Sequence, residues 1–333
     1  MSKDKLIHLF ASCGGIDILR VCNTMPRILF WHGVDHIKDP SIEAESIRVD
    51  VFEKQIDYLA KHYDVISMDE FYRRYTNHSF RGSEITITFD DGYLNNLTCA
   101  APILQKYSLP FMIFVSVENI SQQTFFATSL ARLIIIGGEL TSVNLDSIGV
   151  HIDCPAEDQR IRAARTVGGY IKTSPQDKVN EIVEELKSLI SNSVLQQLMQ
   201  QYTSLKPMTW DDVRKVKRMG ATIGSHCLDH FCCHANQSPE ELRRQIIDSK
   251  TRIEEELKEE GLYFAYPNGD YTKLSNQFVH EAGYRMGFTV RADRLLRPNE
   301  DIASLPRFGM IGNYEKSLTI MNMRLKARKL LGI

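Results

Sequence analysis

The chain has 333 residues, 43% hydrophobic and 25% charged, an ordinary composition for a soluble globular protein of one large or two smaller domains. Its 40 basic and 42 acidic residues give a formal net charge of -2, so no nucleic-acid partner is expected. Seven cysteines and no clear signal peptide favour free thiols in a reducing compartment. We therefore expect a cytoplasmic protein, with peripheral contact to a membrane as an open alternative.

The two ends of the chain differ from its centre. Residues 1–26 contain a moderately apolar stretch that is too short and too polar for a membrane span, and they predict an N-terminal helical segment. Residues 311–333 predict a basic amphipathic C-terminal helix. Residues 27–310 are expected to form the main domain, with an insertion at about 118–206.

Strands and helices alternate along this central part. Residues 27–31, 84–89 and 110–117 predict strands, and the almost continuous apolar run of the third is typical of a parallel sheet. Asp50, followed by Glu53 three residues later, predicts a capped helix. Further helix starts are predicted at the capping residues Ser67, Thr209 and Ser238. Repeated strand-helix units predict an α/β fold, either a parallel barrel or an open doubly wound sheet.

The alternation breaks between residues 118 and 206. This stretch contains Gly137-Gly138 and an amphipathic helix whose apolar positions include Val179, Ile182 and Leu186. We interpret it as a largely helical insertion, with a lid as one use for it.

Residues 85–93, ITITFDDGY, form a strand that ends in two carboxylates. Successive side chains on a strand point to opposite faces, so Asp90 and Asp91 are expected to diverge, one to bind a cation and the other to transfer a proton. Adjacent carboxylates at a buried strand end are costly unless a cation neutralises them. The alternative is an ordinary turn in which Asp90 caps the next helix.

His226 and His230 follow another predicted strand and are four residues apart. If the residues after His226 turn helically, both imidazoles share a face and can bind one cation. Two histidines with one carboxylate form a facial triad that leaves positions open for water and substrate. A rival thiolate site in the same segment comprises Cys227, Cys232, Cys233 and His234. Its spacing argues against zinc, because two of the cysteines are adjacent and no paired C-x-x-C is present.

Three motifs in this order resemble the polysaccharide deacetylases of carbohydrate esterase family 4. They are TFDDG at 88–92, SHxxxH at 225–230 and FAYPNG at 264–269. The resemblance covers roughly residues 27–307 apart from the insertion. It implies a distorted (β/α) barrel and metal-dependent hydrolysis of an N-acetyl group on an amino sugar.

The resemblance also implies roles for individual residues. Asp91, His226 and His230 resemble the family's metal ligands, and Asp90 resembles its general base. We expect one divalent ion, zinc first, with cobalt, nickel or manganese as alternatives, and an N-acetylated carbohydrate substrate. Substrate contacts are assigned to Tyr266, Pro267 and Asn268. Backbone N–H groups after the proline are candidates to stabilise an oxyanion.

Two departures from the family pattern concern the proton chemistry. Ala265 stands where the family often has an arginine, so the group that orients Asp90 must come from elsewhere. Arg307 stands where the family often has a histidine as general acid, and arginine stays protonated at neutral pH. His32, at the end of the first strand, is our candidate acid, with a structural histidine as the alternative. Arg307 is then left to orient Asp90 or to neutralise charge.

Three functions follow from these patterns. The first is a metal-dependent hydrolase that deacetylates an amino-sugar unit of a polysaccharide or glycan intermediate. The second is a degenerate barrel that binds a sugar or lipid-linked sugar without turnover, and the third is an amide hydrolase with a non-sugar substrate. The complete metal set favours the first, whereas the missing arginine and acid favour the second.

Overall fold

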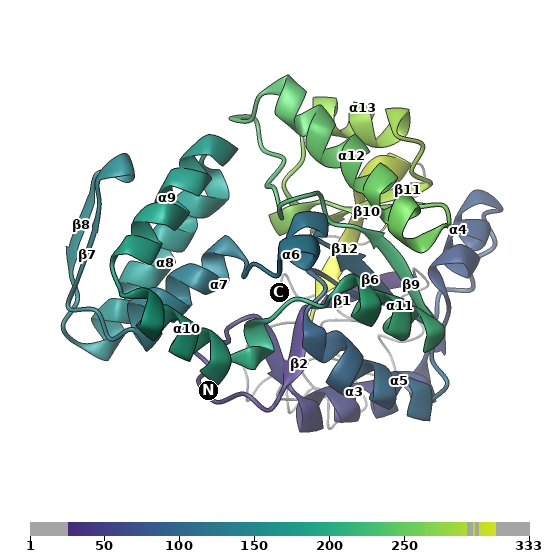
Figure 1. The fold of residues 1–333 in the computed structure, drawn as a ribbon. Helices are drawn as coiled ribbons and strands as arrows, with labels where there is room; N and C mark the ends of the chain where they lie inside the picture. Colours follow the sequence, from purple (N-terminus) through teal and green to yellow (C-terminus); the bar gives the residue numbers. More distant parts are fainter. Residues whose placement is uncertain (1–25, 292–295, 297–299, 311–333) are drawn as a thin grey trace, which may run out of the picture.

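A computed structural model describes residues 26–291, 296 and 300–310 (Figure 1). The helices predicted at the two termini lie outside the described residues. Among the helices of the described ranges, none is both long enough and apolar enough to cross a membrane.

Seven parallel strands close into a barrel, because β5 pairs with β1 as well as with β6. The order around the ring is β1 (Arg27–Trp31), β12 (Leu305–Gly309), β11 (Met286–Val290), β10 (Tyr263–Ala265), β9 (Ala221–Ser225), β6 (Phe111–Val115) and β5 (Glu84–Phe89). Within the described ranges, the short β4 (Asp64–Val65) pairs with the start of β5 and stands outside the ring. The predicted parallel barrel is therefore confirmed, and the open sheet is excluded.

Helices surround the barrel and follow its strands in the chain (Figure 1). They are α3 (Val49–His62), α4 (Met68–Thr76), η1 (Asn96–Ala100), α5 (Ala101–Lys106), α6 (Val117–Gln122), α11 (Trp210–Arg218), α12 (Pro239–Leu257) and α13 (Lys273–Glu281). The side chains of Ser67, Thr209 and Ser238 cap α4, α11 and α12 as predicted. The predicted cap at Asp50 is wrong. Arg48 occupies the cap position of α3. Asp50 lies in the first turn, where its negative charge interacts favourably with the helix dipole.

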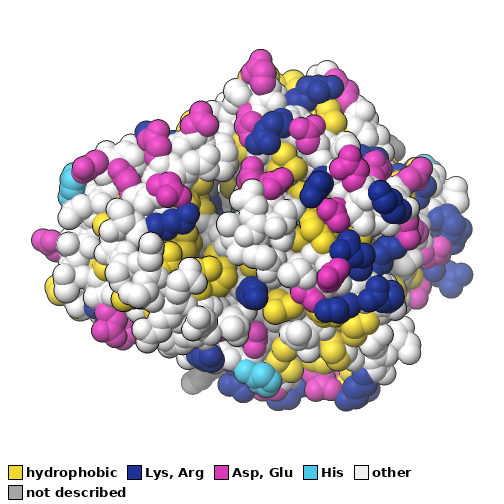
Figure 2. All heavy atoms as spheres, in the orientation of Figure 1, with side chains coloured by type: hydrophobic (Ala, Val, Ile, Leu, Met, Phe, Trp, Pro, Cys, Tyr) yellow, Lys and Arg dark blue, Asp and Glu magenta, His cyan; other side chains and the backbone are white. Residues whose placement is uncertain are grey.

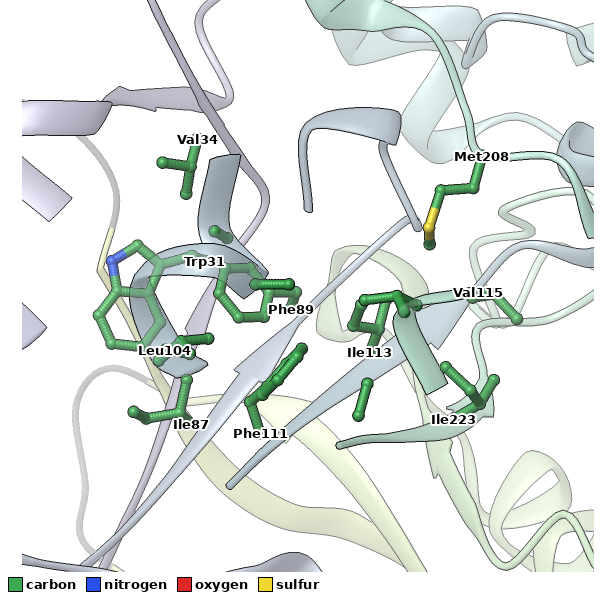
Figure 3. Packing of buried hydrophobic residues seen from close by; sticks show 14 of the residues in the cluster. Trp31, Val34, Ile87, Phe89, Leu104, Phe111, Ile113, Val115, Met208 and Ile223 are labelled. Carbon is green, nitrogen blue, oxygen red and sulfur yellow. The ribbon is translucent and has the colours of Figure 1, made fainter. Parts of the chain in front are cut away.

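Side chains alternate along the strands between the barrel interior and the surrounding helices, which gives two hydrophobic layers. Ile87 and Phe89 of β5 face the surrounding helices, where Trp31 and Leu104 pack beside them (Figure 3). Phe114 of β6 faces inward and meets aromatic side chains from other strands. The inward positions of β5 are instead polar, with Thr86, Thr88 and then Asp90 at the strand end. The barrel interior therefore leads from an apolar core to a charged rim.

The insertion forms a lobe beside the barrel with a hydrophobic core of its own (Figure 1). It contains α7 (Ala127–Arg132), η2 (Leu133–Gly137), α8 (Glu157–Thr173), α9 (Gln176–Ser188), α10 (Asn192–Gln201) and η4 (Thr203–Leu205). Between its helices lies a hairpin, β7 (Ser142–Leu145) and β8 (Val150–Asp153), that the sequence did not reveal. The molecular surface is hollowed between lobe and barrel, and hydrophobic side chains are exposed in this hollow (Figure 2).

One end of the lobe is fastened to the barrel by buried polar groups. Ser204 donates a hydrogen bond to Glu43, which lies between the short strands β2 (Gly33–Asp35) and β3 (Ser46–Arg48). Asn95 donates to the carbonyl of Ser204 at 3.0 Å. Buried hydrogen bonds of this kind hold the insertion in place next to the barrel rim.

Candidate active site and metal centre

The two carboxylates after β5 line one common cavity. Asp90 continues the strand, and its N–H donates to the Trp31 carbonyl at 2.9 Å. Asp91 has a φ of 74°, in the left-handed region that favours glycine. Because Asp91 does not have strand geometry, its side chain does not point to the face opposite that of Asp90. Both side chains line the same cavity, so the expected divergence to opposite faces is wrong. Backbone strain at such a position is typical of functional sites.

His226 and His230 reach Asp91 through a turn and not through a helix. Cys227 and His230 have positive φ values of 63° and 52°, which reverse the chain direction between the two imidazoles. The Nε2 atoms of His226 and His230 lie 3.5 and 3.3 Å from Asp91 Oδ1. The structure therefore brings the three predicted ligands together, with one ligand atom from each within 4.8 Å of the others.

The donor atoms of this cluster fit a divalent cation. His226 Nδ1 lies 2.7 Å from the Ala265 carbonyl oxygen and must carry the proton there, so Nε2 presents a lone pair toward Asp91. Burial lowers the pKa of His226 to about 4, which keeps it neutral at pH 7. Asp91 Oδ1 is buried and has no hydrogen-bond partner among the described residues. A lone pair facing a carboxylate is unfavourable unless a cation lies between them. Two imidazole nitrogens and one carboxylate oxygen are donors that suit zinc.

The charge of Asp91 supports the same interpretation. Burial by itself would raise the pKa of its carboxyl group, but the neighbouring His230, His32 and His226 outweigh burial and hold that pKa below its usual value. The group is therefore an ionised carboxylate at neutral pH, as a metal ligand must be.

Arg307 is the group that orients Asp90. Its two terminal nitrogens donate to Oδ1 and Oδ2 of Asp90 at 2.6 and 2.7 Å. The guanidinium is buried between the rings of Phe30 and Phe114, with its Cζ 4.7 and 5.1 Å from the two ring centroids. Burial would raise the pKa of Asp90, but the charge of Arg307 overcomes it and leaves that pKa below its usual value. Arg307 thus occupies the orienting position that Ala265 cannot fill.

His32 lies on the same cavity wall. Its Nδ1 atom is buried and has no hydrogen-bond partner among the described residues. The His32 carbonyl accepts a hydrogen bond from Asn96 at 2.7 Å, and Asn95 accepts one from the N–H of Val34 at 3.2 Å. The two asparagines therefore fix the loop that carries His32. Sequence reasoning missed them, although they follow the Asp-Asp-Gly motif directly in the stretch YLNN.

Only one of the three predicted substrate contacts lines the cavity. Asn268 lies there with a φ of 57°. The phenol of Tyr266 points away and donates to Asn276 Oδ1 at 2.8 Å, because strand alternation directs it outward toward α13. Pro267 is buried outside the cavity lining. The side chains of Tyr266 and Pro267 therefore lie outside the lining of this cavity, and substrate contact at these two positions stays a prediction.

The lobe completes the cavity, which has a volume of about 120 Å³. The lining residues that sequence reasoning missed are Phe30, Glu45, Tyr93, Phe126, Thr128, Lys172 and Val290. The ring of Phe126 packs edge-on against His230 at 5.5 Å and against Tyr93 at 5.0 Å between centroids. No local pattern marks Phe126, Thr128 and Lys172, because they line the site only once the lobe has docked on the barrel.

The rival thiolate site is not supported. Cys227 and Cys233 are buried with their sulfur atoms 3.8 Å apart, and burial raises the pKa of the Cys227 thiol. Within the described ranges, the cluster with metal-ligand geometry is formed by Asp91, His226 and His230. The cysteines pack as free thiols beside it.

Comparisons with known proteins agree with this geometry. Residues 77–287 match the family model described as polysaccharide deacetylase. No curated protein matches the chain.

Among solved structures, the Streptococcus pyogenes deacetylase PplD in complex with acetate is 17% identical, with a TM-score of 0.58, over 90% of this chain and 99% of that one. IcaB from Ammonifex degensii is 15% identical, with a TM-score of 0.59, over 92% of this chain and 98% of that one. BC0361, a polysaccharide deacetylase from Bacillus cereus, is 13% identical, with a TM-score of 0.54, over 91% of this chain and 69% of that one. At these identities the structures show a shared fold. The family match spans all three sequence motifs and more than half of the chain, and the chain therefore belongs to the polysaccharide deacetylase family.

Proposed function

We propose that the protein is a metal-dependent hydrolase that removes the N-acetyl group from an amino-sugar unit of a polysaccharide or glycan intermediate. The observation that carries this proposal is the position of the Asp91, His226 and His230 donor atoms, which share one cavity with the Asp90–Arg307 pair. When bound, a divalent ion, zinc in the first place, supplies Lewis-acid polarisation of the acetyl carbonyl.

The remaining chemistry belongs to side chains around the cavity. Asp90 takes a proton from the water that attacks the acetyl carbon, and Arg307 holds both carboxylate oxygens in place for this transfer. The carbon–nitrogen bond then breaks, which gives acetate and a free amine on the sugar. His32 donates a proton to the leaving nitrogen, because its imidazole lines the cavity beside Asp90 and Asp91, and imidazole is the side chain that most often acts as a general acid.

The proposal is tested by metal analysis of the purified protein, followed by acetate release from a panel of N-acetylated sugars. Asp90→Asn should retain the metal but lose activity by about a hundredfold or more. Equal loss of metal in Asp90→Asn and Asp91→Asn would contradict the division between base and ligand. Sugar binding without acetate release by the metal-loaded protein would favour a binding protein. Acetate release confined to non-sugar amides would favour the third function.

A further inference from the structure

A second and larger cavity adjoins the active site along the lobe. Its volume is about 440 Å³, and it shares Thr128 and Lys172 with the active-site cavity. One face of α8 forms much of its wall, since the lining positions 161, 164, 165, 168, 169 and 172 recur at helical spacing. The cavity therefore extends the active site toward whatever is attached to the acetylated sugar.

Two glycines keep this cavity open. Gly168 and Gly169 lie inside α8, and a Cβ atom built on either residue meets no atom within 4 Å. Neither has a positive φ that would favour glycine. Glycine weakens a helix relative to alanine, and here neither packing nor backbone conformation requires it. The missing side chains leave space beside two cationic residues on the same helix face.

Two of the three cations in this space have no bonded partner among the described residues. Arg132 donates to the Ile42 carbonyl at 3.0 Å and lies 3.4 Å from Glu45, so it is already paired. Within the part of the chain that the structure describes, Arg165 and Lys172 make no hydrogen bond or ion pair. Lys172 interacts electrostatically with Glu45 across the active-site cavity, without a direct ion pair. Two cations without a bonded partner beside an apolar wall suit a dianion with an apolar neighbour better than a single carboxylate.

We propose that this cavity is a subsite for a phosphorylated extension of the substrate. Arg165 and Lys172 contact the phosphate oxygens, and the apolar wall, which includes Ile136 and Ile161, contacts the group beyond the phosphate. The phosphate has two sources, a phosphorylated glycan or the phosphate that joins a sugar to a lipid carrier. This subsite rests on the proposed function, because it gives the deacetylase a substrate class.

The test compares acetate release by the zinc-loaded protein from three forms of one N-acetylhexosamine. They are a neutral methyl glycoside, the 1-phosphate and a short polyprenyl diphosphate conjugate. We expect KM to be about tenfold lower or more for the phosphorylated forms, the size of a hydrogen bond to a charged group. This preference should weaken at high salt, because Arg165 is exposed and Lys172 is only partly buried.

Matched variants test whether the lower KM for the phosphorylated substrates depends on this cavity. Arg165→Ala should remove most of it and leave the KM for the methyl glycoside unchanged, and Arg165→Lys should restore part of it. Arg162→Ala is the control, since Arg162 lies on the same helix, is exposed and pairs with Asp158 at 2.7 Å. Gly168→Leu adds a side chain where a Cβ atom meets no neighbour within 4 Å, and it should weaken binding of the lipid conjugate more than binding of the 1-phosphate. An equal effect of Gly168→Leu on both substrates would favour the phosphorylated glycan as the source.

Three outcomes separate the subsite from the proposed function. If the methyl glycoside and the phosphorylated forms have the same KM, the subsite is refuted and the deacetylase stands. If Arg162→Ala acts as strongly as Arg165→Ala, the preference reflects general surface charge and the subsite is again refuted. If no sugar releases acetate, the proposed function fails. Calorimetric binding of the 1-phosphate, lost in Arg165→Ala, then supports the subsite, and binding unchanged in that variant refutes it.

Discussion

Replacement of Arg307 by leucine separates orientation of the base from metal binding. Arg307 is 1% exposed and makes two short hydrogen bonds to Asp90, which is 2% exposed. Leucine keeps much of the apolar contact with the neighbouring aromatic rings but removes the charge. Asp90 is then a buried carboxylate without its partner.

The structure gives the size and the pH dependence of the effect. Loss of one partner of a buried ion pair costs about 3–5 kcal/mol in the free energy of unfolding. In the wild type the Asp90 pKa is held below its unfolded value, so the pair stabilises the fold above about pH 4 and loses this effect at lower pH. In Arg307→Leu, burial acts without the opposing guanidinium, so the folded pKa rises above the unfolded one. The variant should therefore recover stability as pH falls through that raised pKa toward the unfolded value of about 4.

Urea unfolding of the chelator-treated proteins across this pH range measures the stability effect. The acidic limb of kcat/KM for the zinc-loaded enzyme should move to higher pH in Arg307→Leu, while zinc stoichiometry stays at the wild-type value. Arg307→Lys, which keeps the charge but loses the two-pronged contact, should give an intermediate result. The double variant Asp90→Asn with Arg307→Leu should be more stable than Arg307→Leu alone, because it contains no unpaired buried charge.

Two results would refute this reasoning. One is a stability loss in Arg307→Leu that does not change with pH, which would assign Arg307 to packing alone. The other is an acidic limb of kcat/KM that stays in place, which would mean that Asp90 is not the base that Arg307 orients.

Three further predictions concern the metal, the acid and the barrel interior. His230→Ala should abolish stoichiometric metal, whereas Cys232→Ser should keep it, as measured by elemental analysis; the reverse result would support a thiolate site. His32→Gln should keep fold and metal but slow hydrolysis of an amide much more than that of an activated ester, whose leaving group needs no proton. If His32→Gln slows the hydrolysis of both substrates equally, or slows neither, His32 has a structural role and is not the acid. Gly224→Val should lower the thermal midpoint, because a Cβ atom there lies 2.7 Å from Phe114 and overpacking of a core costs about 1–3 kcal/mol. An unchanged midpoint would show that the barrel interior can relax.

The sequence by itself determined the fold class and the metal-ligand candidates. The alternation in β5 and the apolar runs of β1 and β6 identify barrel strands, because the side-chain period of a strand depends only on local geometry. Parallel strands gather their carboxyl ends at one rim, so residues that follow such strands are brought together whatever their distance in the chain. This rule selects the Asp90–Asp91 pair, His226 and His230 as one cluster, and the family resemblance then assigns Asp91 to the metal and Asp90 to the base.

Only the tertiary structure decided how these residues are aimed and what else joins them. From the sequence, the side-chain directions of Asp91 and His230 were inferred from regular strand and helix geometry. In the structure, Asp91 has a left-handed backbone and His230 follows a turn, so both side chains point in other directions than those inferred. Arg307 and Asp90 are separated by 217 positions, and no local pattern pairs them. The lobe residues of the site, such as Phe126 and Lys172, line it only after docking. Local periodicity reports the face that a side chain occupies, whereas contacts between distant segments depend on the closed barrel and the packed lobe.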